Sequence, residues 1–184
     1  MKEYKLPIGC DVPETIILAD GDFPSHPLAL EWLRQCPYVV CCDGAANTYI
    51  RSGRMPEAIV GDGDSLLPDI KERYASLIHS EAEQETNDLS KAFRFCLSQE
   101  RKRITIMGAT GKREDHTIGN VSLLADYMEQ AEVSMMTDYG IFVPIREDSM
   151  FESYIGQQIS VFNMNSTALS AEGLAYPLSV FTNW

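Results

Sequence analysis

The sequence predicts an α/β protein: a mostly parallel αβα sheet of about six strands, followed by a smaller all-β, sandwich-like region. From residue 15 to about residue 137, short apolar runs alternate with amphipathic stretches, a rhythm typical of βαβ units. Several runs are almost continuously apolar, as expected for strands that helices cover on both faces. After Asp138 the helical period ends, and short strand-like runs alternate with Gly, Asn, Ser and Asp.

Each apolar run of the first part predicts one strand of the sheet. The predicted strands are Thr15–Ala19, Tyr38–Cys42, Ala58–Val60, Leu77–His79, Ile104–Met107 and Val133–Thr137. The clearest helices between them are predicted over Pro27–Gln35, Asp88–Ser98 and Thr117–Gln130. Proline in the first turn supports the first helix, and apolar residues at helical spacing support the third.

The second part is predicted to be a partial β-sandwich domain over residues 139–184, after an α/β nucleotide-binding domain over residues 1–138. Its predicted strands are Ile141–Ile145, Ser153–Ile155, Gln158–Phe162 and Ala168–Ala171. Only roughly four or five strands fit in this region, whereas an immunoglobulin-like sandwich has about seven, so the domain is expected to be truncated. The final apolar run, which ends at Trp184, has two interpretations: further strands follow it, or it is a native end that packs into the core.

Composition and charge exclude several classes of protein. The 184 residues are 45% hydrophobic and 23% charged, as in a folded globular chain. With 15 Lys and Arg against 27 Asp and Glu, the net charge of −12 disfavours a nucleic-acid partner. No apolar run approaches the roughly 20 residues that cross a bilayer, so no membrane partner is expected. The start lacks a secretory signal pattern, and five cysteines without a CxxC pair suit a reducing, cytoplasmic compartment.

Four polar loops follow predicted strands or precede a predicted helix, and they suggest a binding site. They span residues 43–47 (DGAAN), 61–65 (GDGDS), 83–88 (EQETND) and 108–116 (GATGKREDH). Ligands of open α/β sheets bind outside the carboxyl ends of the strands, so these loops would line one rim. Glycines allow close approach of backbone to a ligand, and a helix N-terminus favours phosphate. Carboxylates there suit Mg²⁺, which characteristically bridges acids to substrate phosphates.

The acidic residues of these loops have more than one interpretation. Asp62 and Asp64 are candidate metal ligands, but Asp and Gly are also ordinary residues of solvated turns. Asp88 can complete a metal site or act as a favourable first-turn acid behind an Asn87 N-cap. Lys91, one turn further on, can contact phosphate or pair with Asp88.

The loop over residues 108–116 is not a P-loop, because no Gly-Lys-Ser/Thr closes it. Arg113 still offers a planar fork for phosphate. His116, placed just before the predicted helix, can be a general base, a phosphate or ribose donor, or merely a first-turn residue.

Taken together, these motifs resemble the thiamine pyrophosphokinase family. The resemblance runs in the family's order through residues 43–47, 56–65 (PEAIVGDGDS), 83–93, 108–116 with Asn120 following, and 173–178 (GLAYPL). It implies a Mg²⁺-dependent enzyme that transfers the pyrophosphoryl group of ATP to the hydroxyl of thiamine, giving thiamine diphosphate and AMP. It also implies a homodimer, in which the second domain contributes the thiamine site and the dimer contact.

The resemblance further implies roles for individual residues. Asp62, Asp64 and Asp88 correspond to the catalytic, metal-binding acids, and Gln84, which lines the same cleft, completes the predicted catalytic set. With Lys91 and Gly108 of the same rim, the candidate nucleotide-binding residues are Asp43, Gly44, Asn47, Asn87, Lys91, Gly108, Arg113, Asp115 and His116. The chain departs from the family in having Lys112 where a glycine is usual, and in ending at Trp184 before a Ser-Asn-containing loop of the thiamine site.

Two other functions stay open at this stage. One is a pyrophosphokinase that acts on a hydroxymethyl-pterin, because its phosphate machinery would look alike. The other is a nucleotide-binding module without catalysis.

Overall fold

The computed structural model describes the chain apart from residues 8–11, 81–84, 165–168, 177 and 179–184. Its core is a seven-stranded sheet in the order β5-β4-β3-β2-β6-β7-β8. Its strands are β2 (Thr15–Leu18), β3 (Val39–Cys42), β4 (Ala58–Val60), β5 (Ile78–His79), β6 (Arg103–Met107), β7 (Glu132–Met136) and β8 (Ile141–Phe142). All neighbours are parallel except β7 and β8. The predicted α/β sheet is confirmed, and its six parallel strands match the predicted runs to within a residue.

In the described part of the chain, five α-helices and one short 3₁₀ turn connect the strands. They are α1 (Pro27–Gln35), α2 (Ala45–Arg51), α3 (Pro68–Arg73), the turn η1 (Ala75–Leu77), α4 (Asp88–Ser98) and α5 (Glu114–Tyr127). Two predicted helices, α1 and α4, have the predicted bounds.

The third predicted helix, Thr117–Gln130, was placed three residues too late, because α5 begins at Glu114 and ends at Tyr127. Glu114 and Asp115 are the reason, since acids in a first turn interact favourably with the helix dipole. His116 therefore lies inside the first turn of the helix and not before it.

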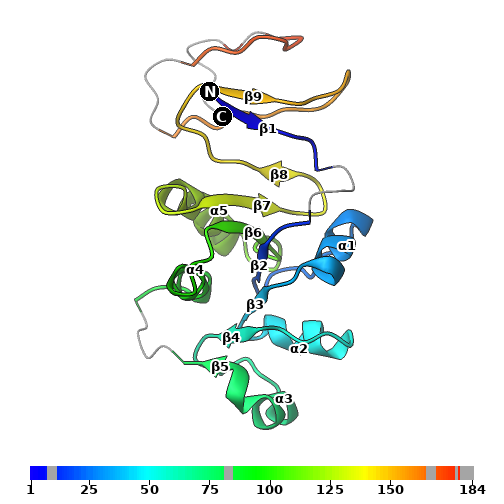
Figure 1. Cartoon of the computed structure of the whole chain (residues 1–184), viewed down its shortest axis with the longest axis vertical. Coiled ribbons are helices and arrows are strands. Elements are labelled where there is room, and N and C mark those ends of the chain that lie inside the picture. Colours follow the sequence, from blue (N-terminus) through cyan, green and yellow to red (C-terminus); the bar gives the residue numbers. More distant parts are fainter. Residues whose placement is uncertain (8–11, 81–84, 165–168, 177, 179–184) are drawn as a thin grey trace.

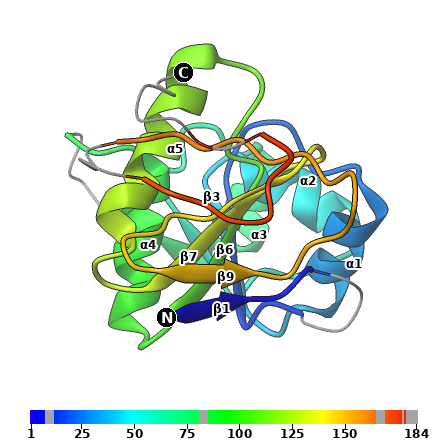
Figure 2. The same cartoon turned by 90° about the horizontal axis from the view of Figure 1, so that it is seen from above.

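The helices form a layer on each side of the sheet (Figures 1 and 2). Alternate strand residues face opposite layers, because side chains along a strand alternate between the two faces. Ile17 and Val40 pack in the core cluster that includes α4 and α5 residues, and Ile16 and Val39 pack in the cluster that includes α1 and α2 residues. Burial on both faces explains why these runs are continuously apolar.

The strand order reverses direction between β2 and β6. From β2 the chain adds β3, β4 and β5 on one side, and α4 then carries it back to β6 on the other side. Neighbouring loops at such a switch point diverge to opposite faces, and this is where open α/β sheets bind ligands. The loops after β2 and β6 therefore mark the centre of the rim.

The region after Asp138 differs from the prediction. The predicted strand Ile141–Ile145 is short, because only Ile141–Phe142 pairs, and it joins the main sheet beside β7. Pro144, two residues after the end of this strand, has no N–H to offer a ladder. A separate two-stranded sheet joins β9 (Ser149–Phe151) in parallel to β1 (Lys2–Tyr4), at one end of the molecule (Figure 1).

The other predicted strands of this region are not formed. Neither Ser153–Ile155 nor Gln158–Phe162 is a strand, and neither are residues 169–171 of the predicted Ala168–Ala171; Ala168 lies outside the described residues. No neighbouring strand among the described residues supplies them with ladder hydrogen bonds, and an unpaired strand is not stable in water. Large apolar side chains here are exposed, namely Met150, Phe151, Tyr154, Ile155, Ile159, Phe162, Met164 and Tyr176.

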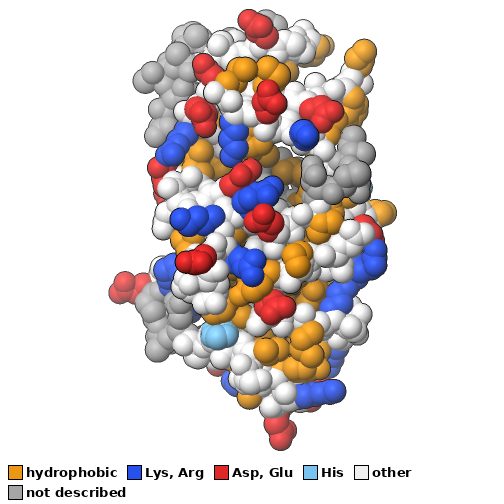
Figure 3. Space-filling model, in the orientation of Figure 1, with side chains coloured by type: hydrophobic (Ala, Val, Ile, Leu, Met, Phe, Trp, Pro, Cys, Tyr) orange, Lys and Arg blue, Asp and Glu red, His pale blue; other side chains and the backbone are white. Residues whose placement is uncertain are grey.

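Two further observations concern the molecular surface and the helices. On the face in Figure 3, acidic and basic side chains are interspersed with apolar ones. Among the described helices, none has the length and apolar character that a membrane span requires.

Candidate active site

Loops that follow the parallel strands meet at the carboxyl edge of the sheet, and three carboxylates lie close together there. Asp43 follows β3, Asp62 follows β4, and Asp88 begins α4. A Cβ atom at Gly61 would lie 2.8 Å from the Asp43 Cβ and 3.4 Å from the Asp88 Cγ. Glycine at 61 therefore lets the two carboxylates approach the same stretch of backbone.

Asp43 is the most deeply placed of these acids, with only 4% of its surface exposed. Its Oδ2 accepts the Ser65 N–H at 3.1 Å, whereas its Oδ1 is buried and has no hydrogen-bond partner in the described part of the chain. Burial raises the pKa of Asp43 above its ordinary value, and the negative charges of Asp88 and Asp62 raise it further, against the Ser65 hydrogen bond. An unpartnered buried carboxylate oxygen is a position suited to a cation.

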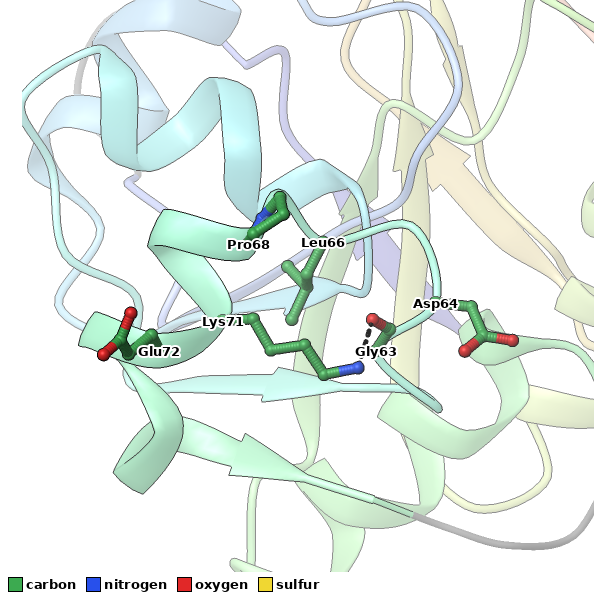
Figure 4. A pocket seen from close by; sticks show the side chains of 6 residues that line it. All are labelled: Gly63, Asp64, Leu66, Pro68, Lys71 and Glu72. Atoms are coloured by element: carbon green, nitrogen blue, oxygen red, sulfur yellow. Dashed lines mark hydrogen bonds between the residues drawn. The ribbon is translucent and has the colours of Figure 1, made fainter.

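Two hydrogen bonds hold the loop that contains Asp62 and Asp64. Asp62 Oδ1 accepts the Asp64 N–H at 3.1 Å, and Lys71 of α3 donates its Nζ to the Gly63 carbonyl at 2.9 Å. Figure 4 shows Lys71 directed at that carbonyl, at an open hollow of about 470 Å³, while the Asp64 carboxylate points away from Lys71. Both acids are exposed, so each can reach a ligand in front of the rim.

Asp88 is partnered by a buried lysine. Lys91 Nζ lies 3.2 Å from Asp88 Oδ1, and the lysine side chain is 4% exposed. This is the i,i+3 pair that the spacing allowed. The pair places the Lys91 side chain at a fixed position beside the acids.

The amide side chains that were predicted to face the nucleotide form hydrogen bonds to neighbouring loops of the rim. Asn87 caps α4 by accepting the Ser90 N–H at 2.9 Å, and it donates to Asn120 Oδ1 at 3.1 Å. Asn120 in turn donates to the Ala109 carbonyl at 2.8 Å, which ties the start of α4 to the loop after β6.

Asn47 holds the loop after β4 in the same way. Its amide donates to the Ser65 carbonyl at 2.8 Å, and its carbonyl oxygen accepts the Leu67 N–H at 3.0 Å. In this arrangement the side chain positions the acidic loop, and a nucleotide contact by Asn47 stays a prediction.

The loop after β6 places its charged residues at the surface. Gly108 has φ +65°, and a Cβ atom there would lie 2.6 Å from the Ala19 carbonyl oxygen, so the position requires glycine. Arg113 donates to both carboxylate oxygens of Asp115, and this contact lowers the pKa of Asp115 to about 2. His116 is exposed in the first turn of α5.

The structure brings most of the predicted residues to this rim, and it adds Asp20, which the sequence reasoning missed. Asp20 follows β2, and a Cβ atom at Gly44 would lie 2.6 Å from its Oδ2. Lys112 contacts Asp20 through its Nζ at 3.0 Å. The available signal was the Asp-Gly-Asp sequence at 20–22, which repeats that of 62–64 directly after the first strand. Gln84 lies outside the described residues.

These donors fit a magnesium ion in chemistry. Among the described residues, no three His, Cys, Asp or Glu side chains form a ready-made cage. Mg²⁺ is usually held by one or two carboxylates together with substrate phosphates, so a complete protein cage is not required. The hard oxygen donors are present, and the unpartnered Asp43 Oδ1 lacks a positive partner.

Comparison with protein families decides the relationship. Residues 29–136, more than half of the chain, match the model of the thiamin pyrophosphokinase catalytic domain. The chain belongs to the thiamin pyrophosphokinase family. Residues 140–184 match the family's substrate-binding domain.

Individual thiamin pyrophosphokinases agree with this assignment. The thiamine pyrophosphokinase 1 of Oryza sativa subsp. japonica is 30% identical over 129 residues, covering 56% of this chain and 49% of the rice protein. The crystal structure of the yeast thiamin pyrophosphokinase superposes with a TM-score of 0.59 at 18% identity, covering 74% of this chain and 63% of the yeast chain. That from Geobacillus thermodenitrificans gives 0.55 at 26% identity, covering 66% and 58%. The chain spans about half the length of the curated relatives it matches.

Proposed function

We propose that this chain transfers the pyrophosphoryl group of ATP to the hydroxyl of thiamine, giving thiamine diphosphate and AMP. The observation that carries the proposal is the cluster of Asp43, Asp62 and Asp88 around Gly61, at the rim where open α/β sheets bind ligands. Membership of the thiamin pyrophosphokinase family favours thiamine over a hydroxymethyl-pterin as the acceptor.

The proposed division of labour follows the two matched regions. Residues 1–138 would bind the nucleotide and carry out the transfer, and residues 139–184 would contribute to the thiamine site and to a homodimer contact. We propose a cytoplasmic location for the enzyme.

Asp62, Asp64 and Asp88 would hold Mg²⁺, with the buried Asp43 carboxylate behind them. The ion would neutralise charge on the phosphate oxygens. Lys91 would hold Asp88 in place, and Asn47 and Lys71 would hold the acidic loop. Arg113, Asp115 and His116 would lie beside the nucleotide, together with Gly44, Asn87 and Gly108; Gln84 would line the cleft.

In the reaction we propose, the thiamine hydroxyl oxygen attacks the β-phosphorus of ATP in line with the bond to the α–β bridging oxygen. That bond breaks, its electron pair leaves with AMP, and the hydroxyl proton passes to solvent. No covalent enzyme intermediate is needed, because phosphoryl transfer depends chiefly on positioning and on neutralising charge. The described residues of the site accordingly offer acids, amides and cations, and none of them is an activated nucleophile.

The first experiment is product analysis after mixing the protein with ATP, MgCl₂ and thiamine. We expect AMP and thiamine diphosphate in equal amounts. Asp62→Asn should reduce the rate by roughly 100-fold, the scale on which one charge-stabilising group acts. Asp126→Asn, an exposed position on α5, is the matched control and should leave the rate unchanged.

Other outcomes would contradict parts of the proposal. Binding of ATP without release of AMP would indicate a nucleotide-binding module. AMP formation that depends on a hydroxymethyl-pterin and not on thiamine would reassign the acceptor.

A further inference from the structure

The loops that follow β2 and β6 are in contact across the switch point of the sheet. The Gly21 N–H donates to the Gly108 carbonyl at 2.6 Å. A Cβ atom at Gly21 would lie 2.3 Å from the Thr110 carbonyl oxygen, so the two backbones touch. Lys112 joins the same loops through its side chain, since Nζ donates to the Asp20 carbonyl at 2.9 Å and to Asp20 Oδ1 at 3.0 Å.

The backbone at Lys112 has a conformation that favours glycine. Its φ is +57°, and among the described residues only Asp43 and Glu100 share a positive φ without being glycine. Glu100 lies just after α4, where a left-handed residue is ordinary. Asp43 and Lys112 both lie at the rim, and such residues cluster at ligand sites, where the strain of order 1 kcal/mol is compensated by function. A lysine at a position that favours glycine indicates that its side chain has a functional role.

The cations of the rim differ in how free they are to meet a ligand. Lys91 is 4% exposed and bound to Asp88. Arg113 is 62% exposed, but it donates to both carboxylate oxygens of Asp115, and a bidentate contact is stronger than a single one. The Lys112 side chain is 54% exposed and held by a carboxylate that is itself 46% exposed. A pair so exposed contributes at most about 1 kcal/mol, so a phosphate oxygen can replace the carboxylate at little cost.

The position of this pair suits a polyphosphate. Asp20 Oδ2 lies against Gly44 at the start of the 43–47 loop, so the Lys112 ammonium stands beside the nucleotide rim. The loop that carries Lys112 leads directly into the 14-residue helix α5, whose first turn already holds the acids Glu114 and Asp115. The Lys112 ammonium would offset part of the repulsion between the neighbouring acids of the rim and a triphosphate.

We propose that Lys112 is a polyphosphate-binding residue that favours triphosphate donors over monophosphates, and that Asp20 holds its ammonium in place until the donor binds. This inference rests on the proposed function, because it assigns a further residue to the donor site of the same reaction.

The test is direct binding, by calorimetry, of AMP and of a non-hydrolysable α,β-methylene analogue of ATP, each with MgCl₂. Lys112→Met should weaken binding of the ATP analogue about tenfold and that of AMP by less than about twofold. Lys102→Met is the matched control, because Lys102 is exposed and precedes β6 at the opposite end of the same strand. It should bind both nucleotides as the wild type does.

A second variant distinguishes the effect of the Lys112 charge on binding from the effect of the loop backbone. Lys112→Gly accepts the positive φ without strain, so it should unfold at a higher temperature than Lys112→Met. Its affinity for the ATP analogue should nevertheless be as weak as that of Lys112→Met. Wild-type affinity in Lys112→Gly would overturn the inference, since the backbone and not the charge would then determine binding.

Asp20→Asn tests the holding role. Without its counter-ion, Lys112 should bind the ATP analogue at least as tightly as in the wild type. If Asp20→Asn instead weakens binding as much as Lys112→Met does, the Lys112–Asp20 pair only holds the two loops together, and the inference is overturned. Equal effects of Lys112→Met on both nucleotides, or none, would also overturn the inference while the proposed function stands. A wild-type protein that binds no ATP analogue would overturn both.

Discussion

At the scale of single residues, the site contains three charged residues whose burial or backbone conformation is unusual. Asp43 is buried with an unpartnered oxygen, Lys91 is buried against Asp88, and Lys112 is held in a left-handed backbone. Each of these arrangements costs stability, and all three lie at one rim. Strain and unpaired charge gathered in one place indicate a site selected for binding and not for stability alone.

Asp43 allows a pH-dependent prediction. Because burial raises its pKa above the ordinary 3.8, the folded protein binds this proton more tightly than the unfolded chain does. Stability from this group therefore falls as pH rises from about 3.8 through the raised pKa, and the deficit persists above it. Asp43→Asn keeps an oxygen for the Ser65 N–H and removes the charge.

We expect Asp43→Asn to unfold at a higher temperature than the wild type at neutral pH, in buffer without Mg²⁺. The advantage should shrink as the pH is lowered toward about 4, because the wild-type carboxyl then becomes neutral. Calorimetric unfolding temperatures across this range measure the effect, and Asp126→Asn should give a flat difference. An advantage that grows on acidification would contradict the assigned direction of the pKa shift.

At the scale of elements, loops at the rim are held by side chains from distant strands. After β7, the Asp138 carboxylate accepts the N–H groups of Ser25 and His26 at 2.9 Å, as well as the Ser25 hydroxyl. These bonds lower the pKa of Asp138. These hydrogen bonds hold the loop between β2 and α1 against the end of β7, so the Asp138 carboxylate fixes the position of that loop.

Asp138→Asn should therefore destabilise the protein at neutral pH. Loss of charge-assisted hydrogen bonds at a partly exposed site costs about 1 kcal/mol, or roughly 2–4 °C in unfolding temperature for a chain of this size. Since the folded pKa is depressed, this stabilisation is present above the ordinary pKa of 3.8 and is lost as pH falls through the lowered value. The wild type and Asp138→Asn should converge in acid, and a difference that persists below the lowered pKa would argue against this role.

Elements differ in how well the sequence predicts them. The six parallel strands were predictable, because runs such as Thr15–Leu18 are buried on both faces and so carry a strong apolar signal. The loops of the acidic cluster were predictable as well, since position after a strand and residue type sufficed. Asp20 was missed, although the signal of Asp-Gly-Asp after a strand was the same.

At the scale of the whole molecule, the sequence signal weakens where pairing is between distant segments. β9 pairs with β1, and Leu6 N–H also donates to Glu152 Oε2 at 3.1 Å, across 146 positions of sequence. No local pattern reports such a partner, and the runs at 153–155 and 158–162 look like strands but have none among the described residues. Alternation predicts which residues can form a strand, not whether a neighbour exists.

The β1–β9 sheet predicts how stability is distributed over the molecule. Three residue pairs join these strands, and the Tyr4 and Phe151 rings stack with centroids 4.7 Å apart. The strand pair forms a sheet of its own beyond β8, at one end of the molecule (Figure 1). A two-stranded sheet is marginal by itself, so β9 should be ordered only while β1 is present. The seven-stranded sheet is buried between its two helix layers and does not use these bonds.

Deleting residues 1–6 should therefore raise amide hydrogen exchange at residues 149–151 to nearly unprotected rates. Protection of β2, β3 and β6 should stay at the level of global unfolding, because local opening draws on different contacts. Tyr4→Ala, which removes the ring stack but leaves the backbone pairs, should give an intermediate increase. Loss of protection in the central strands after the deletion would mean that the two sheets fold as one unit, and the nucleotide site would then depend on the N-terminal strand.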